Sequence, residues 1–175
     1  MEVIETERLV LRRPRASDAP AIFARYASDP EVTRYLSFPT HRSLDDTHAF
    51  ISSSDVAWTQ WPLGPYLVFA RDGVTLLGGA GLGFETPYRA ETGYVFAQDA
   101  WGRGYATEAL EATVACARKT AVRRIHAGVH CDHHTSRRVL EKAGFTCEGV
   151  MRAFTEFPNL RPGEPCDVFS YALIL

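Results

Sequence analysis

Two glycines flank an arginine at residues 102–104, inside the stretch WGRGYATEAL, and a helical pattern begins directly after them. That helix places Ala106, Leu110 and Val114 on one face at 3.6-residue spacing, and a strand-like run precedes the turn at residues 91–97. A second strand-like run follows the helix at residues 123–130. The middle of the chain must therefore form a strand–helix–strand unit, which predicts a local parallel pairing.

The rest of the pattern adds strands that need no crossover helix. Before the turn, the expected strands are residues 8–13, 66–71 and 75–84, and the expected helices are residues 17–30 and 43–58. After residue 130 come a helix at 136–145, which completes a second strand–helix–strand unit, and two closing strands at 145–157 and 167–175. This order predicts an α+β fold with a single mixed, mostly antiparallel sheet flanked by helices.

Short local signals support several of these boundaries. Asp72-Gly73 separates two apolar runs and predicts a hairpin turn. Ser43 stands three residues before Asp46, which is a capping-box spacing for the start of a helix. The glycine cluster GGAGLG at residues 78–83 fits a strand whose small residues allow another backbone to approach closely.

The bulk composition bounds the class of protein. A chain of 175 residues suits one domain, residues 1–175, and a net charge of −2 argues against a broad nucleic-acid surface. No apolar run is long enough to span a bilayer, and the first residues lack the apolar core of a signal peptide, so we expect a cytoplasmic protein without membrane contact. The four cysteines form no C-x-x-C pair, which favours reduced, unpaired thiols.

The glycine turn has three competing interpretations. A dinucleotide fingerprint requires a third glycine where Thr107 stands and a position after the first strand of the unit, and a P-loop requires a G-K-[ST] ending that is missing here. A plain helix start that binds only water remains open. The physics favours an anion, because Gly102 and Gly104 permit a tight turn and the N–H groups from about Arg103 to Thr107 have no helical partner.

Several separate segments, in the right order, resemble one family. WGRGYATEAL is similar to the acetyl-CoA turn of the GNAT N-acetyltransferases, [QR]-x-x-G-x-[GA], with Trp101 in the first place and with Gly104 and Ala106 in the other two. Residues 6–36, the segment HCDHHTSRRVLEKAGF and the closing DVFSYAL resemble the RimJ/RimL branch, which acetylates the N-termini of ribosomal proteins. The resemblance covers nearly the whole chain and implies a sheet in which two central parallel strands splay apart.

The resemblance also implies where acetyl-CoA would bind as a co-substrate. The pantetheine arm would pair with backbone groups near Val95 and Phe96, in the gap between the two parallel strands. The diphosphate would lie on the turn. The residues implied for that contact are Arg103, Gly104, Tyr105, Ala106 and Thr107.

Two residues are candidates for the chemistry of acetyl transfer. Ser136 matches the family serine near the thioester sulfur and would donate its hydroxyl to the departing thiolate; alternatively it only caps the helix that it begins. Glu91, at the start of the central strand, is the candidate general base, directly or through water; alternatively it is a strand-edge acid paired with Arg89 or another base.

The segment HCDHH departs from the family pattern. His133 stands where the family has Asn, which contacts the pantetheine, so His133 is the candidate for that contact, with His134 or a backbone group as substitutes. The clustered histidines lack the spacing of a structural zinc site, and we expect no metal. The loop at residues 157–166 is a candidate lid, and some of the aromatic residues Trp58, Trp61, Tyr66, Phe84 and Tyr88 are candidates for the wall of an acceptor pocket.

The resulting prediction is an acetyl-CoA-dependent N-acetyltransferase that works by direct transfer in a ternary complex. An α-amino group, with a pKa of roughly 7.7–8.0 against about 10.4 for lysine, needs less help to lose its proton, which favours a peptide N-terminus as acceptor over lysine. A small amine fits equally well. The alternatives are a non-catalytic acyl-CoA-binding module and, less favoured, a dinucleotide oxidoreductase. We expect a monomer or a homodimer.

Overall fold

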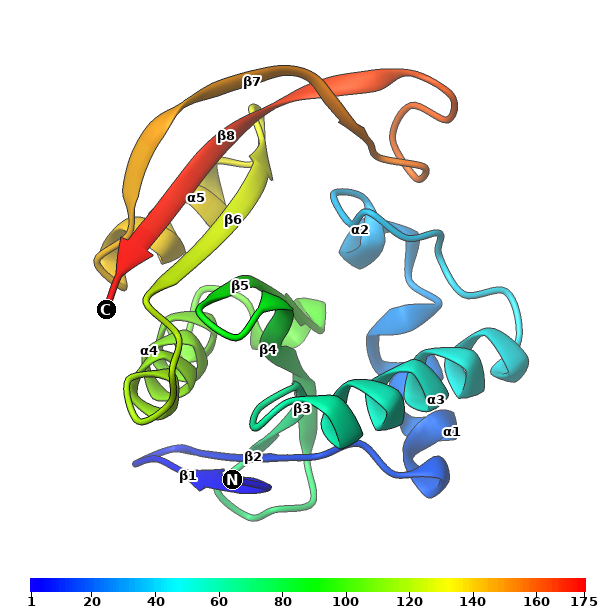
Figure 1. The fold of residues 1–175 in the computed structure, drawn as a ribbon. Helices are drawn as coiled ribbons and strands as arrows, with labels where there is room; N and C mark the ends of the chain where they lie inside the picture. Colours follow the sequence, from blue (N-terminus) through cyan, green and yellow to red (C-terminus); the bar gives the residue numbers. More distant parts are fainter.

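The computed structural model describes residues 1–175, and one eight-stranded sheet runs through it (Figure 1). The strand order is β1-β2-β3-β4-β5-β6-β8-β7. The strands are β1 (Val3–Glu5), β2 (Leu9–Arg12), β3 (Pro65–Ala70), β4 (Leu76–Thr86), β5 (Arg89–Phe96), β6 (Arg124–His130), β7 (Thr146–Glu156) and β8 (Pro165–Ile174). The α+β fold with a mixed sheet is confirmed.

The β5–β6 pair is the parallel neighbour pair of the sheet, and it is short. Its three Cα partners are Arg89–Arg124, Ala90–Ile125 and Glu91–His126, after which the two strands no longer pair. The expected splayed central pair is therefore present. The second strand–helix–strand unit, β6-α5-β7, does not form a parallel neighbouring pair. Strand β8 lies between β6 and β7 and is antiparallel to both.

The helices differ from the sequence prediction mainly near the N-terminus. Residues 17–30 form three short turns, η1 (Ala16–Asp18), α1 (Ala19–Ile22) and the π-turn η2 (Phe23–Ala27), followed by α2 (Pro30–Thr33). The sequence pattern predicted neither the short helix α2 nor the short strand β1. The longer helices are α3 (Leu44–Gln60), α4 (Tyr105–Ala117) and α5 (His134–Lys142), and η3 (Gln98–Ala100) precedes the glycine turn.

Two local predictions are confirmed in detail. The Asp46 carboxylate accepts the backbone N–H of Ser43 at 3.1 Å, and α3 begins at the next residue. In the β3–β4 turn, the carboxylate of Asp72 accepts the N–H groups of Val74 and Thr75 at 2.8 and 2.9 Å. Short polar side chains thus fix the start of α3 and the turn between β3 and β4.

The glycine cluster at 78–83 is part of strand β4. A Cβ on Gly81 would lie only 2.5 Å from the carbonyl oxygen of Gly64, so the glycine is needed for close backbone packing against the start of β3. The structural interpretation of this cluster is confirmed.

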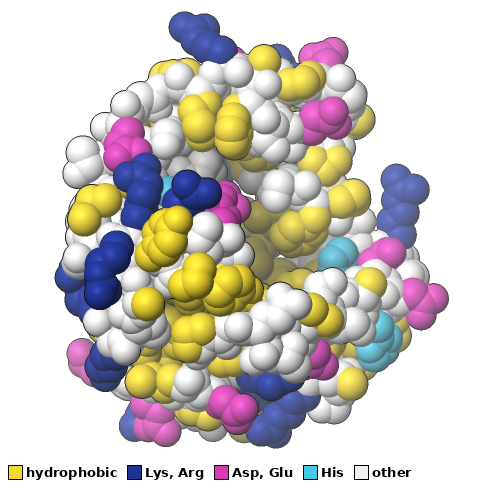
Figure 2. Space-filling view, in the orientation of Figure 1, with side chains coloured by type: hydrophobic (Ala, Val, Ile, Leu, Met, Phe, Trp, Pro, Cys, Tyr) yellow, Lys and Arg dark blue, Asp and Glu magenta, His cyan; other side chains and the backbone are white.

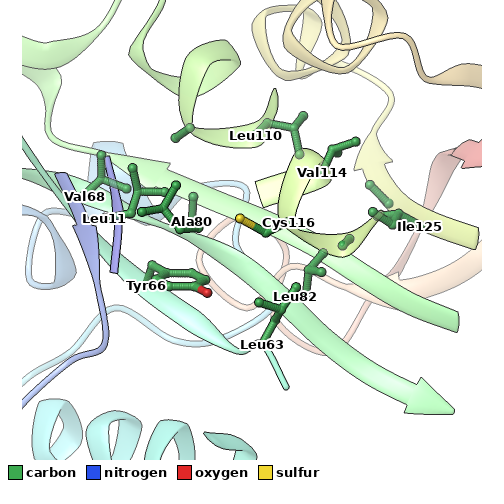
Figure 3. Packing of buried hydrophobic residues seen from close by; sticks show 14 of the residues in the cluster. Leu11, Leu63, Tyr66, Val68, Ala80, Leu82, Leu110, Val114, Cys116 and Ile125 are labelled. Atoms are coloured by element: carbon green, nitrogen blue, oxygen red, sulfur yellow. The ribbon is translucent and has the colours of Figure 1, made fainter. Parts of the chain in front are cut away.

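Both faces of the sheet are covered by helices. On one face α4 packs against β2, β4 and β5, and Leu110 and Val114 lie among buried side chains such as Val68 and Leu82 (Figure 3). On the other face α1 and α3 cover β3 and β4. Because neighbouring residues of a strand face opposite sides, Leu67 joins the second cluster while Val68 joins the first. No helix is both long and apolar enough to cross a membrane.

Candidate functional site

The glycine turn, residues 101–107, joins η3 to the first turn of α4. Gly102 and Gly104 have φ of 72° and 78°, the left-handed region that other residues rarely adopt. The first helical hydrogen bond runs from the N–H of Glu108 to the carbonyl of Gly104 at 3.1 Å. The N–H groups of Tyr105, Ala106 and Thr107 therefore have no partner within the helix, and they stand at the positive end of its dipole.

Arg8, which directly precedes β2, and Glu108 of α4 brace the turn. Arg8 donates to the carbonyl oxygen of Arg103 at 2.9 Å and to the Glu108 carboxylate at 2.6 Å, and its guanidinium lies 4.9 Å from the centre of the Tyr105 ring. Glu108 also accepts the hydroxyl of Thr6 at 2.6 Å. Partial burial opposes ionisation, but these hydrogen bonds hold the pKa of Glu108 below its usual value. The carboxylate therefore remains charged.

A second brace ties the turn to the end of β5. The indole Nε1–H of Trp101 donates to the carbonyl oxygen of Phe96 at 2.6 Å, and Asp99 forms an ion pair with Arg25 at 2.8 Å. Arg103 itself makes no ion pair, so its charge remains available for a bound anion. The carbonyl of Phe96, expected to be open to pantetheine, already accepts one hydrogen bond.

The gap between the splayed strands is a cavity of about 580 Å³. Thr92 to Val95 of β5, Ala127 to His130 of β6 and Ser136 of α5 line it, together with Glu91 at the apex. Hydrophobic side chains form its floor, visible as the hollow near the centre of Figure 2. The side chain of Phe96, by contrast, is buried and lies outside this lining.

Glu91 occupies the last paired position of β5, beside His126 of β6. Its expected partner Arg89 instead pairs with Glu85, which also lies 3.3 Å from Nε2 of His126. The Arg89 alternative for Glu91 is therefore wrong. Surrounding protein raises the pKa of Glu91 above its usual value, although His126 opposes this shift, so the carboxylate is a better proton acceptor than one in open water.

Ser136 meets a residue that the sequence analysis missed, Tyr94 of β5. The Tyr94 hydroxyl donates to the backbone carbonyl oxygen of Ser136 at 2.9 Å, and it also lies 2.9 Å from Oγ of Ser136. Helix α5 begins at His134 and its N-cap residue is His133, so the proposal that Ser136 caps the helix is wrong. Burial raises the pKa of Tyr94, which keeps its phenol protonated.

His133 points into the cavity and stacks on Tyr35, with ring centres 4.6 Å apart. Burial and the neighbouring His130 and His134 lower its pKa to about 4, so the ring is neutral near pH 7 and can donate one hydrogen bond and accept another. His130 uses Nδ1 to accept the N–H of Asp132 at 3.2 Å. No group of three or more His, Cys, Asp or Glu side chains is arranged to hold a metal ion.

The far side of the cavity is an aromatic wall. It consists of five rings contributed by the α2–α3 connection, α3 and the β7–β8 hairpin: Tyr35, Phe38, Phe50, Phe154 and Phe157. Of the aromatic residues expected there, only Tyr66 lines the cavity. Trp58 packs in the core, and Trp61 stacks on Phe84 with ring centres 5.0 Å apart.

One asparagine, also missed in the sequence, joins the two halves of this wall. Asn159 donates to the carbonyls of Thr33 and Phe38 at 2.8 Å each, and it accepts the N–H and the hydroxyl of Thr40 at 2.8 and 3.0 Å. All hydrogen-bonding positions expected of one amide are thus occupied. The loop proposed as a lid is fastened across the cleft in this structure, and Figure 1 shows it reaching towards α2.

Comparison with known proteins agrees with this geometry. Residues 8–146 match the Acetyltransferase (GNAT) domain family. The uncharacterized N-acetyltransferase YoaA of Bacillus subtilis (strain 168) is 31% identical over 175 residues, which cover 98% of this chain and 96% of YoaA.

Solved structures show the same fold over the full length. A GNAT-family acetyltransferase from Bacillus anthracis superimposes with a TM-score of 0.85 at 26% identity and covers 98% of both chains. RimL, the ribosomal L7/L12 α-N-protein acetyltransferase solved with coenzyme A, gives 0.88 at 23% identity over 99% of this chain and 98% of RimL. The chain therefore belongs to the GNAT acetyltransferase family and is an N-acetyltransferase.

Proposed function

We propose that the protein transfers an acetyl group from acetyl-CoA to the α-amino group of a peptide or protein N-terminus. The observation that carries this proposal is the cavity between the splayed strands β5 and β6, which has the Glu91 carboxylate at its apex and Ser136 in its lining. Acetyl-CoA supplies the thioester that is consumed. Residues 1–175 act as one N-acetyltransferase domain, and its four free thiols suit the cytoplasm.

The turn suits a diphosphate. Unpartnered N–H groups at the start of α4, the free charge of Arg103 and the open space around Gly102 all favour an anion. We assign the diphosphate contact to Arg103, Gly104, Tyr105, Ala106 and Thr107. RimL, a structural neighbour, was solved with coenzyme A.

We assign the pantetheine contacts to β5 and α5. The backbone of Val95 borders the cavity, and the carbonyl of Phe96 can accept a second hydrogen bond besides that of Trp101. His133 replaces the family Asn, and a neutral imidazole retains one donor and one acceptor for this contact.

Three side chains move or hold the protons in the transfer. Glu91 accepts a proton from the substrate ammonium, directly or through a water, so that the neutral amine can attack the thioester carbonyl, and its raised pKa brings it closer to that of the amine. The Ser136 hydroxyl donates to the sulfur as the C–S bond breaks. The Tyr94 hydroxyl, 2.9 Å from both the carbonyl oxygen and Oγ of Ser136, holds this serine in place.

The transfer is direct from thioester to amine. None of the four cysteines lines the cavity, and Cys116 and Cys166 are buried elsewhere, so no thiol is positioned to carry the acetyl group. A single weak base suits an α-amine, whose pKa is roughly 2.5 units below that of lysine. The likeness to RimL supports the same acceptor.

The test measures CoA release from acetyl-CoA with two hexapeptide amides. The first has a free N-terminus. The second has a formylated N-terminus and one internal lysine, so that lysine is its only free amine. Acetylation of the first peptide alone, located by mass spectrometry, is the expected result. Release with only small amines would replace the peptide acceptor. Binding of acetyl-CoA without release to any amine would identify a non-catalytic binding module instead.

A further inference from the structure

The only charged side chain that lines the cavity, histidines aside, is negative. Its lining contains a single carboxylate, Glu91, and no lysine or arginine. The ordinary cationic partners of a substrate carboxylate or phosphate are therefore missing from the walls. A ligand that enters this cavity meets one negative charge, uncharged polar groups such as the hydroxyls of Tyr94 and Ser136, and apolar surface.

Two of the three histidines of the lining are neutral near pH 7. Burial lowers the pKa of His133 to about 4 and also lowers that of His41, whose Nδ1 shares a hydrogen bond with the Thr47 hydroxyl at 2.8 Å. The third, His130, uses Nδ1 to accept the backbone N–H of Asp132 at 3.2 Å.

A peptide acceptor must place its first two residues within this lining. Its amine has to reach the apex near Glu91 and Ser136, and an extended chain advances only about 3.5 Å per residue. The second side chain is therefore within about 8 Å of the amine, against the aromatic wall. Glu91 retains solvent exposure, but a separation of about 8 Å is no longer than the Debye length at physiological salt, so repulsion between two negative charges persists.

We propose that the enzyme selects amines that have no anionic group within two residues of the reacting nitrogen. This inference rests on the proposed function and narrows it. Peptide N-termini with uncharged first and second side chains are substrates. Free amino acids, aminophosphates and N-termini with an acid at either position are rejected, because Glu91 repels the anion and nothing in the lining pairs with it.

The test compares two hexapeptide amides that begin alanine–asparagine and alanine–aspartate and are otherwise identical. The pair is isosteric and presents an α-amine in each case. We expect kcat/KM for the aspartate peptide at pH 7 to be at least tenfold lower, which corresponds to 1.4 kcal/mol. Calorimetric binding of each peptide to the enzyme–CoA complex provides a second readout that does not depend on turnover.

A positive charge introduced into the lining should reduce the discrimination between the two peptides. Ser37 lies in the lining and is exposed, so Ser37→Arg adds a cation without disturbing the core. This variant should bring the ratio of the two kcat/KM values to within about threefold, whereas the uncharged control Ser37→Gln should leave the ratio unchanged. Equal rates for the two peptides with the unaltered enzyme would overturn the inference and leave N-terminal acetylation intact. Failure to acetylate either peptide, with small amines accepted, would overturn the proposed function and the inference with it.

Discussion

The glycine turn and the aromatic wall of the cavity are the two ends of the path proposed for acetyl-CoA and the acceptor, and they are built in opposite ways. The turn consists of consecutive residues, exposes backbone N–H groups and is braced by charged side chains such as Arg8 and Glu108. The wall is assembled from segments that lie more than a hundred residues apart, is apolar, and is joined by one amide, Asn159.

This contrast distinguishes the binding of acetyl-CoA, which members of the family have in common, from the binding of the acceptor, which differs between members. A diphosphate is the same for every member, so one short motif can bind it with backbone groups. An acceptor differs between members, so its pocket consists of side chains on loops and at the ends of helices, where substitution is tolerated. The predictions below test whether the two ends act independently, and they run from the largest expected effect to the smallest.

Removal of the charge at the apex, between the two ends, should have the largest effect. Glu91→Gln keeps the shape of the side chain but removes the proton acceptor, so the rate at saturating acetyl-CoA should fall ten- to a hundredfold near pH 7. The loss should shrink as the pH rises, because the amine then arrives already neutral. A pH–rate profile like that of the unaltered enzyme would show that Glu91 transfers no proton.

A substitution in the glycine turn should weaken the binding of acetyl-CoA and leave the binding of the acceptor unchanged. Gly104→Val places a branched side chain at φ 78°, where the anion is expected, and should weaken acetyl-CoA binding at least tenfold, or about 1.4 kcal/mol. Gly104→Asn is the matched control for backbone strain, because Asn tolerates this conformation but still adds a Cβ. Calorimetry that finds unchanged affinity in both folded variants would remove the diphosphate from this turn.

Removal of the serine hydroxyl should slow the transfer without affecting either end. Ser136→Ala should lower kcat by about tenfold and leave the affinity for CoA unchanged, since the hydroxyl acts only as the sulfur departs. Tyr94→Phe should lower kcat by a smaller factor, and it should have no further effect in the Ser136→Ala background because both changes remove the same hydrogen bond. Additive losses in the double variant would separate Tyr94 from Ser136.

The buried histidine predicts how stability depends on pH. His133 has a pKa of about 4 in the folded protein and about 6.5 when unfolded, so between these values the unfolded chain binds the extra proton. Stability should therefore fall by roughly 1–2 kcal/mol between pH 7 and pH 5 on account of this ring. In urea titrations, His133→Asn should show a shallower fall, and an unchanged slope would mean that the ring is charged at no cost to folding.

The difference between the two ends also explains what the sequence could predict. The glycine turn and the parallel pairing of the strands on either side of α4 follow from the pattern around Gly102 and Gly104, whereas the splaying of that pair was implied by the family resemblance. The bonds from Tyr94 to Ser136 and from Asn159 to Thr33 join distant segments, and nothing in the local pattern marks these residues. The alternative interpretation of Ser136 as a helix cap was wrong because α5 begins about half a turn earlier, at His134, and its N-cap residue His133 makes no side-chain capping hydrogen bond.

The position of β8 has a consequence for how the chain folds. Strand β8 lies between β6 and β7, and it pairs with β6 from Arg124–Ile174 to His130–Val168. Until that pairing forms, β6, which supplies one wall of the cavity, has an exposed strand edge. Such non-local pairing forms slowly, and unpaired edges favour aggregation in the meantime. The cavity is thus complete only once β8 has joined the sheet.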